Sequence, residues 1–188
     1  MNENKILIID LETTGFLNKG GHIVEVGIVE LDLSTGEKKI IFDEIVLEHG
    51  TSWPEIRDSW ICNNSDLKPN AIASAKDLEM YARTIQQILN GYPAGATAFN
   101  NAFDFGFMED RGFNFPKKLP CPMLLATPIC KIPNRNGYAG YKWPKVEEVH
   151  LHFFGDVGYI EKHRGADDAM HEAAIVYELY KRGVFKIK

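Results

Sequence analysis

The sequence is poor in cysteine, and the cysteines it contains do not pair in any recognisable pattern. The three are Cys62, Cys121 and Cys130, and no two of them form a C-x-x-C pair. A structural zinc site or a disulfide scaffold would need such a pair, or an even and closely spaced set. We therefore expect neutral thiols in a reducing compartment.

The sequence also lacks a long hydrophobic run. Only four apolar residues separate the N-terminal MNENK from Asp10, which is too few for the core of a signal peptide. No other run approaches membrane-spanning length. These features predict a soluble, cytoplasmic protein without a membrane partner.

A surplus of basic residues is absent as well. Lysine and arginine number 21 against 26 aspartate and glutamate residues, so the formal net charge is -5 at pH 7. This balance argues against a protein that coats nucleic acid through a broad basic surface, but it is compatible with a narrow nucleic-acid cleft. No G-x-x-x-x-G-K-[ST] loop is present, which argues against nucleoside triphosphate binding.

The chain has 188 residues, 45% of them hydrophobic, which is enough for one well-packed domain. Apolar runs separated by turn residues predict a β-meander, and polar sequence with proline interrupts the pattern at 51–70. The apolar runs are 5–10, 22–33 and 38–48. Helical spacing then predicts helices at about 74–90, 142–154 and 166–182, with a short strand at 96–99. This order predicts a single α/β layered domain over residues 1–188.

Two acids follow the first apolar run. Asp10 and Glu12 lie two residues apart, so they project to the same side of a strand end and both carboxylates can reach one metal ion. Behind them, Thr13, Thr14 and Gly15 form a tight turn whose amides and hydroxyls can face a phosphate or a terminal nucleotide. An acid at a strand end is also a common turn or capping residue, so this motif alone does not decide the function.

A second motif lies in FNNAFDFGFM, residues 99–108. Asn100 and Asp104 are four residues apart, so a helix that begins near Asn100 would stack them on one face and aim Asp104 at the strand pair. The phenylalanines of this segment can stack bases, but the i, i+4 spacing of Phe103 and Phe107 favours ordinary core packing for those two.

A third motif lies in HRGADDA, where His163 is flanked by Gly158 and Gly165 and Asp168 falls in the first turn of the last predicted helix. We interpret this as a mobile base beside a fixed ligand. Asp167 is an alternative ligand, or an acid that the helix dipole favours in the first turn. The remaining histidines have no matching group of acids and are expected at the surface or in packing. They are His22, His49, His150, His152 and His171.

Together these motifs resemble those of the DnaQ-like 3'-to-5' exonucleases of the DEDDh subgroup, and the resemblance spans nearly the whole chain. In that family D-x-E, N-x-x-x-D and H-x-x-x-x-D occur in this order, and the last spacing selects Asp168 over Asp167. IVEVGIVEL is similar to the family's second strand, and KWPKVEEVHLHFFG to the helix before the catalytic histidine. The resemblance implies a ribonuclease H-like three-layer α/β fold, with a mixed central β-sheet flanked by helices. One departure is Phe99, where many relatives have a histidine, and it concerns substrate contact rather than the metal ligands.

The activity implied by this resemblance is metal-dependent release of nucleoside monophosphates from the 3' end of a nucleic acid. Asp10, Glu12, Asp104 and Asp168 would hold two divalent ions, and hard oxygen ligands favour Mg²⁺ or Mn²⁺ over zinc. His163, with an ordinary pKa of about 6.5, would take the proton from the attacking water.

The expected partner is a nucleic-acid 3' end, with single-stranded DNA favoured over RNA, and with Thr13, Thr14, Gly15 and Asn100 contacting the substrate. The alternatives are RNA trimming like that of RNase T and a catalytically silent nucleic-acid-binding module. Basic residues are candidates for phosphate contacts or for solvated surface. They are Lys117, Lys118, Lys142, Lys145 and Arg164.

The sequence leaves homodimer formation open. Because no long tail follows the last predicted helix, it gives no indication of a tether to a polymerase. We therefore expect a free-standing enzyme, or one that docks to a polymerase by its surface.

Overall fold

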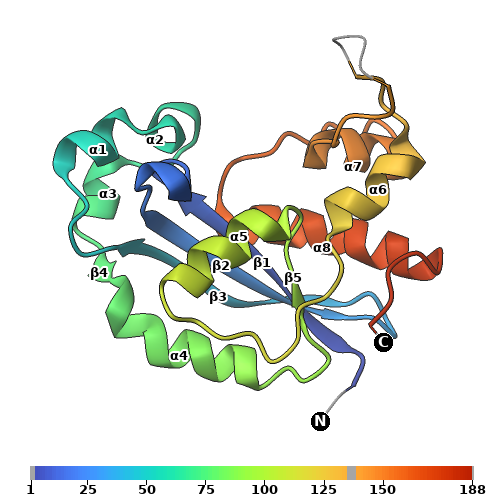
Figure 1. Cartoon of the computed structure of the whole chain (residues 1–188), viewed down its shortest axis with the longest axis horizontal. Helices are drawn as coiled ribbons and strands as arrows, with labels where there is room; N and C mark the ends of the chain where they lie inside the picture. Colours follow the sequence, from blue (N-terminus) through green and yellow to red (C-terminus); the bar gives the residue numbers. More distant parts are fainter. Residues whose placement is uncertain (1–2, 135–138, 188) are drawn as a thin grey trace.

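The computed structural model describes residues 3–134 and 139–187, and its N-terminal part is an antiparallel β-meander (Figure 1). The strands are β1 (Lys5–Thr13), β2 (Ile23–Asp32) and β3 (Lys38–Leu47). β2 pairs antiparallel with both of its neighbours. The predicted meander is therefore confirmed.

Two short parallel strands complete the sheet. β4 (Lys76–Asp77) pairs with β3, and β5 (Ala96–Thr97) pairs with β1, so the strand order is β4-β3-β2-β1-β5. The central sheet is therefore mixed, as predicted.

Helices cover both faces of the sheet (Figure 1). Alternate residues of β1 belong to different cores. The main helices are α4 (Leu78–Asn90), α5 (Asn101–Asp110), α6 (Pro122–Cys130), α7 (Val146–Phe154) and α8 (Gly165–Lys181). Ile6 and Ile8 belong to the core shared with α6, α7 and α8, whereas Leu7 and Ile9 belong to the core shared with α4 and α5. The result is the predicted three-layer α/β arrangement.

The polar stretch 51–70 is more structured than its composition suggested. It forms the short helices α1 (Trp53–Asp58) and α2 (Trp60–Asn64) and the start of α3 (Pro69–Ala73). Ser52 and Ser59 act as N-caps, because their side chains accept hydrogen bonds from the amides of Glu55 and Cys62. A small separate core, which includes Ile56, packs these helices against the sheet. A further short 3-10 helix, η1 (Leu17–Lys19), follows β1.

Helix boundaries differ from the expectations where capping or proline decides them. α4 begins at Leu78 rather than near residue 74, because the Asp77 carboxylate caps it by accepting a 2.8 Å hydrogen bond from the Glu79 amide. α7 begins only at Val146, so Pro144 precedes the helix instead of lying in its first turn. α6 was not predicted, and it contains the internal Pro128.

Across the ranges 3–134 and 139–187, no helix combines the length and the apolar character needed to cross a membrane.

Candidate active site

Asp10 and Glu12 lie at the end of β1, on the side of the sheet that α8 covers. They follow the alternation of Ile6 and Ile8, which face that side. Opposite them on β2 are Gly27 and Glu25 respectively. The two carboxylates therefore share one face of the strand end, as the spacing implied.

Two glycines let α8 approach this strand end closely. A Cβ atom on Gly165 would lie 2.8 Å from the Gly27 nitrogen and 3.2 Å from the Asp10 carbonyl oxygen. Only a residue without a side chain fits there. Gly165 is thus the first residue of α8 and a close-packing position, rather than a source of mobility for His163.

Asp104 comes from the first turn of α5 and is 4% exposed. Its Oδ1 atom accepts a 3.1 Å hydrogen bond from the Leu11 amide, which ties α5 to the strand segment between Asp10 and Glu12. Asn100 occupies the N-cap position without a side-chain capping bond, and it lines the same cavity as Asp104.

Asp168 is the acid of α8 that faces the site. It is 1% exposed, and its carboxylate accepts hydrogen bonds from the Arg164 amide (2.8 Å) and from the Lys162 amide and the Tyr159 hydroxyl (both 3.3 Å). Asp167 instead forms a 3.1 Å ion pair with Lys162. The geometry therefore brings Asp168, and not Asp167, to the other acids.

His163 completes a close group with Glu12 and Asp168. Potential ligand atoms of the three side chains all lie within 4.8 Å of one another. His163 has a backbone φ of 54°, a conformation that costs energy for a residue with a side chain and that is enriched at functional sites. Its ring meets the Trp60 ring edge to face, with the centroids 4.7 Å apart.

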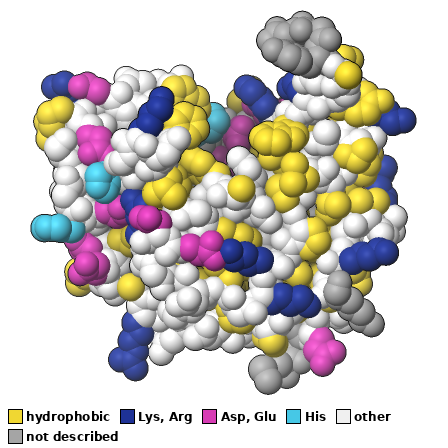
Figure 2. Space-filling model, in the orientation of Figure 1, with side chains coloured by type: hydrophobic (Ala, Val, Ile, Leu, Met, Phe, Trp, Pro, Cys, Tyr) yellow, Lys and Arg dark blue, Asp and Glu magenta, His cyan; other side chains and the backbone are white. Residues whose placement is uncertain are grey.

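A cavity of about 200 Å³ joins these side chains. Its lining includes Asp10, Glu12, Asn100, Asp104 and His163. Figure 2 shows acidic and histidine side chains in a hollow, with hydrophobic side chains on both sides of it. The three sequence motifs thus converge at one place from β1, α5 and the start of α8.

Burial and mutual repulsion raise the pKa values of the acids in this cavity. The pKa of Asp10 is held well above its ordinary value, first by burial and then by the charge of Glu172. Burial, with Asp168 and Glu25 nearby, raises the pKa of Glu12 to about 9. The pKa of Asp104 rises to about 7, again through burial. Carboxylates concentrated in this way favour a bound cation.

Two further acids surround the site and were not expected. Glu172 is 3% exposed and accepts a 3.2 Å hydrogen bond from the Phe99 amide, and burial raises its pKa well above the ordinary value. Burial, followed by the charge of Asp168, raises the pKa of Glu161 to about 7. One available signal was that Glu172 lies four residues after Asp168, on the same face of the last helix.

Phe99, the departure from the family pattern, packs in the core at 5% exposure and contributes to the cavity lining. Phe107 is fully buried, as expected for core packing, whereas Phe103 is half-buried and lines the cavity. The prediction that both residues pack in the core is therefore confirmed for Phe107, and for Phe103 only in part.

Most of the basic residues suggested for phosphate contact have protein partners. Arg164 forms hydrogen bonds of 2.7 to 3.1 Å with the Glu25 carboxylate, which is 1% exposed. The same carboxylate accepts a bond from the Gly165 amide at 3.3 Å. Arg164 thus anchors the backbone next to His163. Three of the lysines also have partners, namely Lys142 with Glu148, Lys118 with Glu109 and Lys117 with the Ile187 carbonyl.

A second, apolar cavity of about 400 Å³ adjoins the acidic one and shares Leu11, Glu12 and Phe103 with it. Its other lining residues are Thr13, Thr14, Gly15, Phe16, Trp60 and Ile61. The turn expected to contact substrate therefore lies beside the acids.

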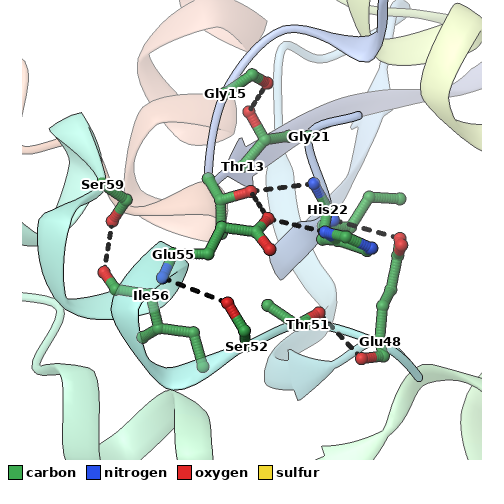
Figure 3. Close-up of polar contacts among 12 residues, drawn as sticks. Thr13, Gly15, Gly21, His22, Glu48, Thr51, Ser52, Glu55, Ile56 and Ser59 are labelled. Carbon is green, nitrogen blue, oxygen red and sulfur yellow. Dashed lines mark hydrogen bonds and ion pairs between the residues drawn. The ribbon is translucent and has the colours of Figure 1, made fainter. Parts of the chain in front are cut away.

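The turn is fixed by a polar network with α1 (Figure 3). Glu55 Oε1 accepts a 2.6 Å hydrogen bond from the Thr14 hydroxyl and lies 2.6 Å from His22 Nδ1. The His22 amide donates to the Thr14 hydroxyl at 2.9 Å, and the Thr13 hydroxyl donates to the Gly15 carbonyl at 2.9 Å. The threonine hydroxyls are therefore engaged within the protein, and His22 has a defined structural partner.

The donor set fits a hard divalent cation. It consists of carboxylate oxygens with one imidazole, and burial followed by neighbouring negative charge raises the pKa values of Asp10 and Glu12. Glu12, His163 and Asp168 are close enough together to share one ion, and Asp10 and Asp104 line the same acidic cavity as Glu12.

Comparisons with known proteins agree with this arrangement. No family model matches the chain. A PolC-type DNA polymerase III from Clostridium perfringens is 23% identical over 184 residues, which is 96% of this chain and 11% of that polymerase. The structure of cell-death related nuclease 4 (CRN-4) has a TM-score of 0.68 at 13% identity, covering 96% of this chain and 64% of that one.

A further structure is the nuclease domain of 3'hExo, described as a DEDDh family member bound to rAMP. It has a TM-score of 0.66 at 15% identity and covers 97% of this chain and 96% of that one. At these identities the structural matches show the fold, while the sequence match covers only a small part of a much longer polymerase. The fold of these nucleases, the order of the motifs and the sequence match therefore agree with the resemblance to DEDDh exonucleases that the motifs indicate.

Proposed function

We propose that this protein is a metal-dependent 3'-5' exonuclease that releases nucleoside monophosphates from the 3' end of single-stranded DNA. The observation that carries the proposal is the convergence of the DEDDh motif residues on one acidic cavity, beside an apolar cavity large enough for a base. A terminal nucleotide would place its base in the apolar cavity and its phosphodiester over the acids.

The residues of the site have distinct roles in this mechanism. Asp10, Glu12, Asp104 and Asp168 would bind two Mg²⁺ or Mn²⁺ ions, which supply charge neutralisation and a more acidic water when bound. His163 accepts a proton from the attacking water, as an imidazole beside the carboxylates can. Asn100 and the turn Thr13–Gly15 orient the terminal nucleotide, so that the scissile bond lies within reach of the acids.

DNA is proposed as the substrate because the sequence match is to a DNA polymerase. RNA is the second candidate, because one similar structure is titled as 3'-end specific recognition of histone mRNA stem-loop by 3'-exonuclease, with a TM-score of 0.67 at 17% identity. Another similar domain is bound to rAMP.

Digestion of 5'-labelled single-stranded DNA and RNA of matched sequence, with Mg²⁺ or Mn²⁺, tests both the reaction and the substrate. We expect a ladder shortened from the 3' end with the wild type, its loss with Asp10→Ala, and a much slower but still measurable ladder with His163→Ala. Internal fragments would indicate an endonuclease, and binding without cleavage would indicate a silent module.

Asp167 supplies a matched control for the same assay. Asp168→Asn is expected to abolish the ladder, whereas Asp167→Asn, one residue away and paired with Lys162 on the surface, is expected to keep it. Activity of the purified chain alone, with its mass measured in solution, would establish whether a polymerase or a second copy is needed.

A further inference from the structure

Trp60 is an unusual neighbour for the proposed general base. Its side chain is 58% exposed at the start of α2, yet its ring lies 4.7 Å from the His163 ring at an interplanar angle of 79°. Edge-to-face contacts of this kind are attractive and directional. An exposed indole is therefore in contact with the histidine of the site.

The His163 ring has little else to orient it. Within 3–134 and 139–187, its nitrogens are not hydrogen-bonded to another protein group, although one of them lies within 4.8 Å of a carboxylate oxygen of Glu12 and of Asp168. A catalytic histidine is commonly oriented by a third group that hydrogen-bonds its far nitrogen. Here the Trp60 ring is the group in contact, while the left-handed backbone at His163 sets the direction of the side chain.

Trp60 is held in place relative to Glu12 by the elements around it. The Ser59 hydroxyl donates to the Ile56 carbonyl at 2.7 Å and accepts from the Cys62 amide at 3.3 Å, which joins α1 to α2. α1 is in turn fixed to the turn after Glu12 by the Glu55 network of Figure 3. The indole is therefore mounted on the same framework as the acids.

The same indole lines the apolar cavity of about 400 Å³. A base bound there would cover part of its exposed surface and reduce the freedom of the ring. Occupation of the cavity and the orientation of His163 would thus be linked through one side chain.

We propose that Trp60 is a positioning residue that orients His163 for proton transfer and links this orientation to binding of the terminal base. The inference rests on the proposed nuclease function. This role differs from that of a residue that only lines the base cavity, because such a residue would affect substrate binding without acting through His163.

A double-mutant cycle with Trp60→Ala and His163→Ala tests the proposal. Misplacing a catalytic group by about 1 Å can cost about 10²-fold in rate, and we expect Trp60→Ala alone to lower kcat roughly 10- to 100-fold. In the His163→Ala background the same change should lower kcat less than about 2-fold, because the group being positioned is gone. Equal losses in both backgrounds would overturn the positioning role.

A substrate with an abasic 3'-terminal nucleotide separates the two functions of the indole. Such a substrate cannot contact Trp60 through a base. If Trp60 only lines the base cavity, the wild type and Trp60→Ala should therefore have equal kcat values on this substrate. The positioning role predicts that Trp60→Ala remains slower, and that Trp60→Phe recovers most of the rate. Trp53→Ala is the control, since Trp53 is a 44% exposed indole on the preceding helix.

Fluorescence gives a readout apart from activity. The chain has three tryptophans, so Trp53→Phe with Trp143→Phe leaves Trp60 as the only indole. Its emission should change on adding His163→Ala and on adding a nucleoside monophosphate with Mg²⁺, and an unchanged emission in both cases would overturn the proposal. If the wild type degrades neither DNA nor RNA, the proposed nuclease function is wrong. If the wild type is active but the effects of Trp60→Ala and His163→Ala on kcat are additive, only the positioning role of Trp60 is wrong.

Discussion

Two sets of buried carboxylates in this molecule differ in what neutralises them. Glu25 and Glu48 are 1% and 9% exposed, and each accepts hydrogen bonds from an arginine, Arg164 and Arg111 respectively. Both bonds join segments that are distant in sequence. Each buried negative charge has a geometrically matched positive one, so removal of either acid is expected to destabilise the fold by leaving its arginine poorly compensated.

The second set is the acidic cavity, where Asp104, Asp168 and Glu172 are equally buried, at 4%, 1% and 3% exposure. In the described parts of the chain, no lysine or arginine side chain forms an ion pair with them. Backbone amides and one tyrosine hydroxyl are their hydrogen-bond donors. The first set therefore has positive partners within the chain, whereas the second has none among the described residues and is suited to binding a cation from solution.

Replacing an acid of the second set should have the largest effect on activity and little effect on folding. Asp104→Asn keeps an oxygen that can accept the Leu11 amide but removes the charge. We expect kcat to fall on the order of 10²–10³-fold, the size of loss typical for one electrostatic group of an active site. The melting temperature in chelator should stay equal or rise, as measured by calorimetry. A clear fall in the chelated melting temperature would mean that the acid is structural.

Replacing an acid of the first set should give the opposite result. Glu48→Gln leaves the largely buried Arg111 with only the exposed Asp110 as a charge partner, and we expect a loss of about 3 kcal/mol in unfolding free energy. That corresponds to roughly 6 to 12 °C in melting temperature for a chain of this size. Below the transition kcat should be unchanged.

Glu25→Gln sharpens this contrast, because the partner arginine of Glu25 is the residue next to His163. We expect a smaller loss of about 2 kcal/mol, since Arg164 is 35% exposed and remains partly hydrated. Unlike Glu48→Gln, it should also lower kcat. Equal kcat values for Glu25→Gln and Glu48→Gln would show that the ion pair of Glu25 with Arg164 does not affect the active site.

The pH dependence of stability should reveal the uncompensated charge of the second set. The pKa of Glu12 is raised from 4.5 to about 9, and that of Asp104 from 3.8 to about 7. Between these ordinary and raised values the unfolded chain releases protons that the folded chain keeps, so folding stability falls as pH rises from about 4 to 9. In chelator we expect the melting temperature to fall by several degrees over that window.

Adding Mg²⁺ or Mn²⁺ should remove most of this dependence, because a bound cation favours the ionised acids. Binding at 100 times the dissociation constant adds about 2.7 kcal/mol of stability. Thermal melts at pH 5 and pH 8, with and without the ion, measure both effects. An identical pH dependence with and without metal would show that these acids do not bind it.

The features that the sequence predicted well are those with a local signature. The alternation of β1 placed Asp10 and Glu12 on one face, because strand geometry has a period of two. The position of Asp168 in the first turn of the last helix followed from the apolar spacing of that helix. Both inferences need only neighbouring residues.

Features that depend on distant partners were missed. The sequence suggests Arg164 as a candidate phosphate contact and does not reveal its partner Glu25, which lies 139 residues away. The spacing of Glu172 from Asp168 indicates a shared helix face, but its burial depends on a distant partner, the Phe99 amide, which donates a hydrogen bond to it. The sequence does not predict the helices at 51–70, because they are too short to show a helical spacing of apolar residues. Their serine N-caps define them instead.

The smallest expected effect concerns the network that holds the turn, not either set of buried acids. Glu55→Gln weakens two 2.6 Å contacts at a partly exposed site, and a net loss of about 1 kcal/mol is typical for such hydrogen bonds. Because the turn lines the apolar cavity, the loss should raise KM by roughly 3- to 10-fold while kcat changes less than about 2-fold. Asp58→Asn, at an exposed ion pair on the same helix, is the control and should change neither constant. A fall in kcat with constant KM would instead connect the network to the acids, because Glu12 lies directly before the turn.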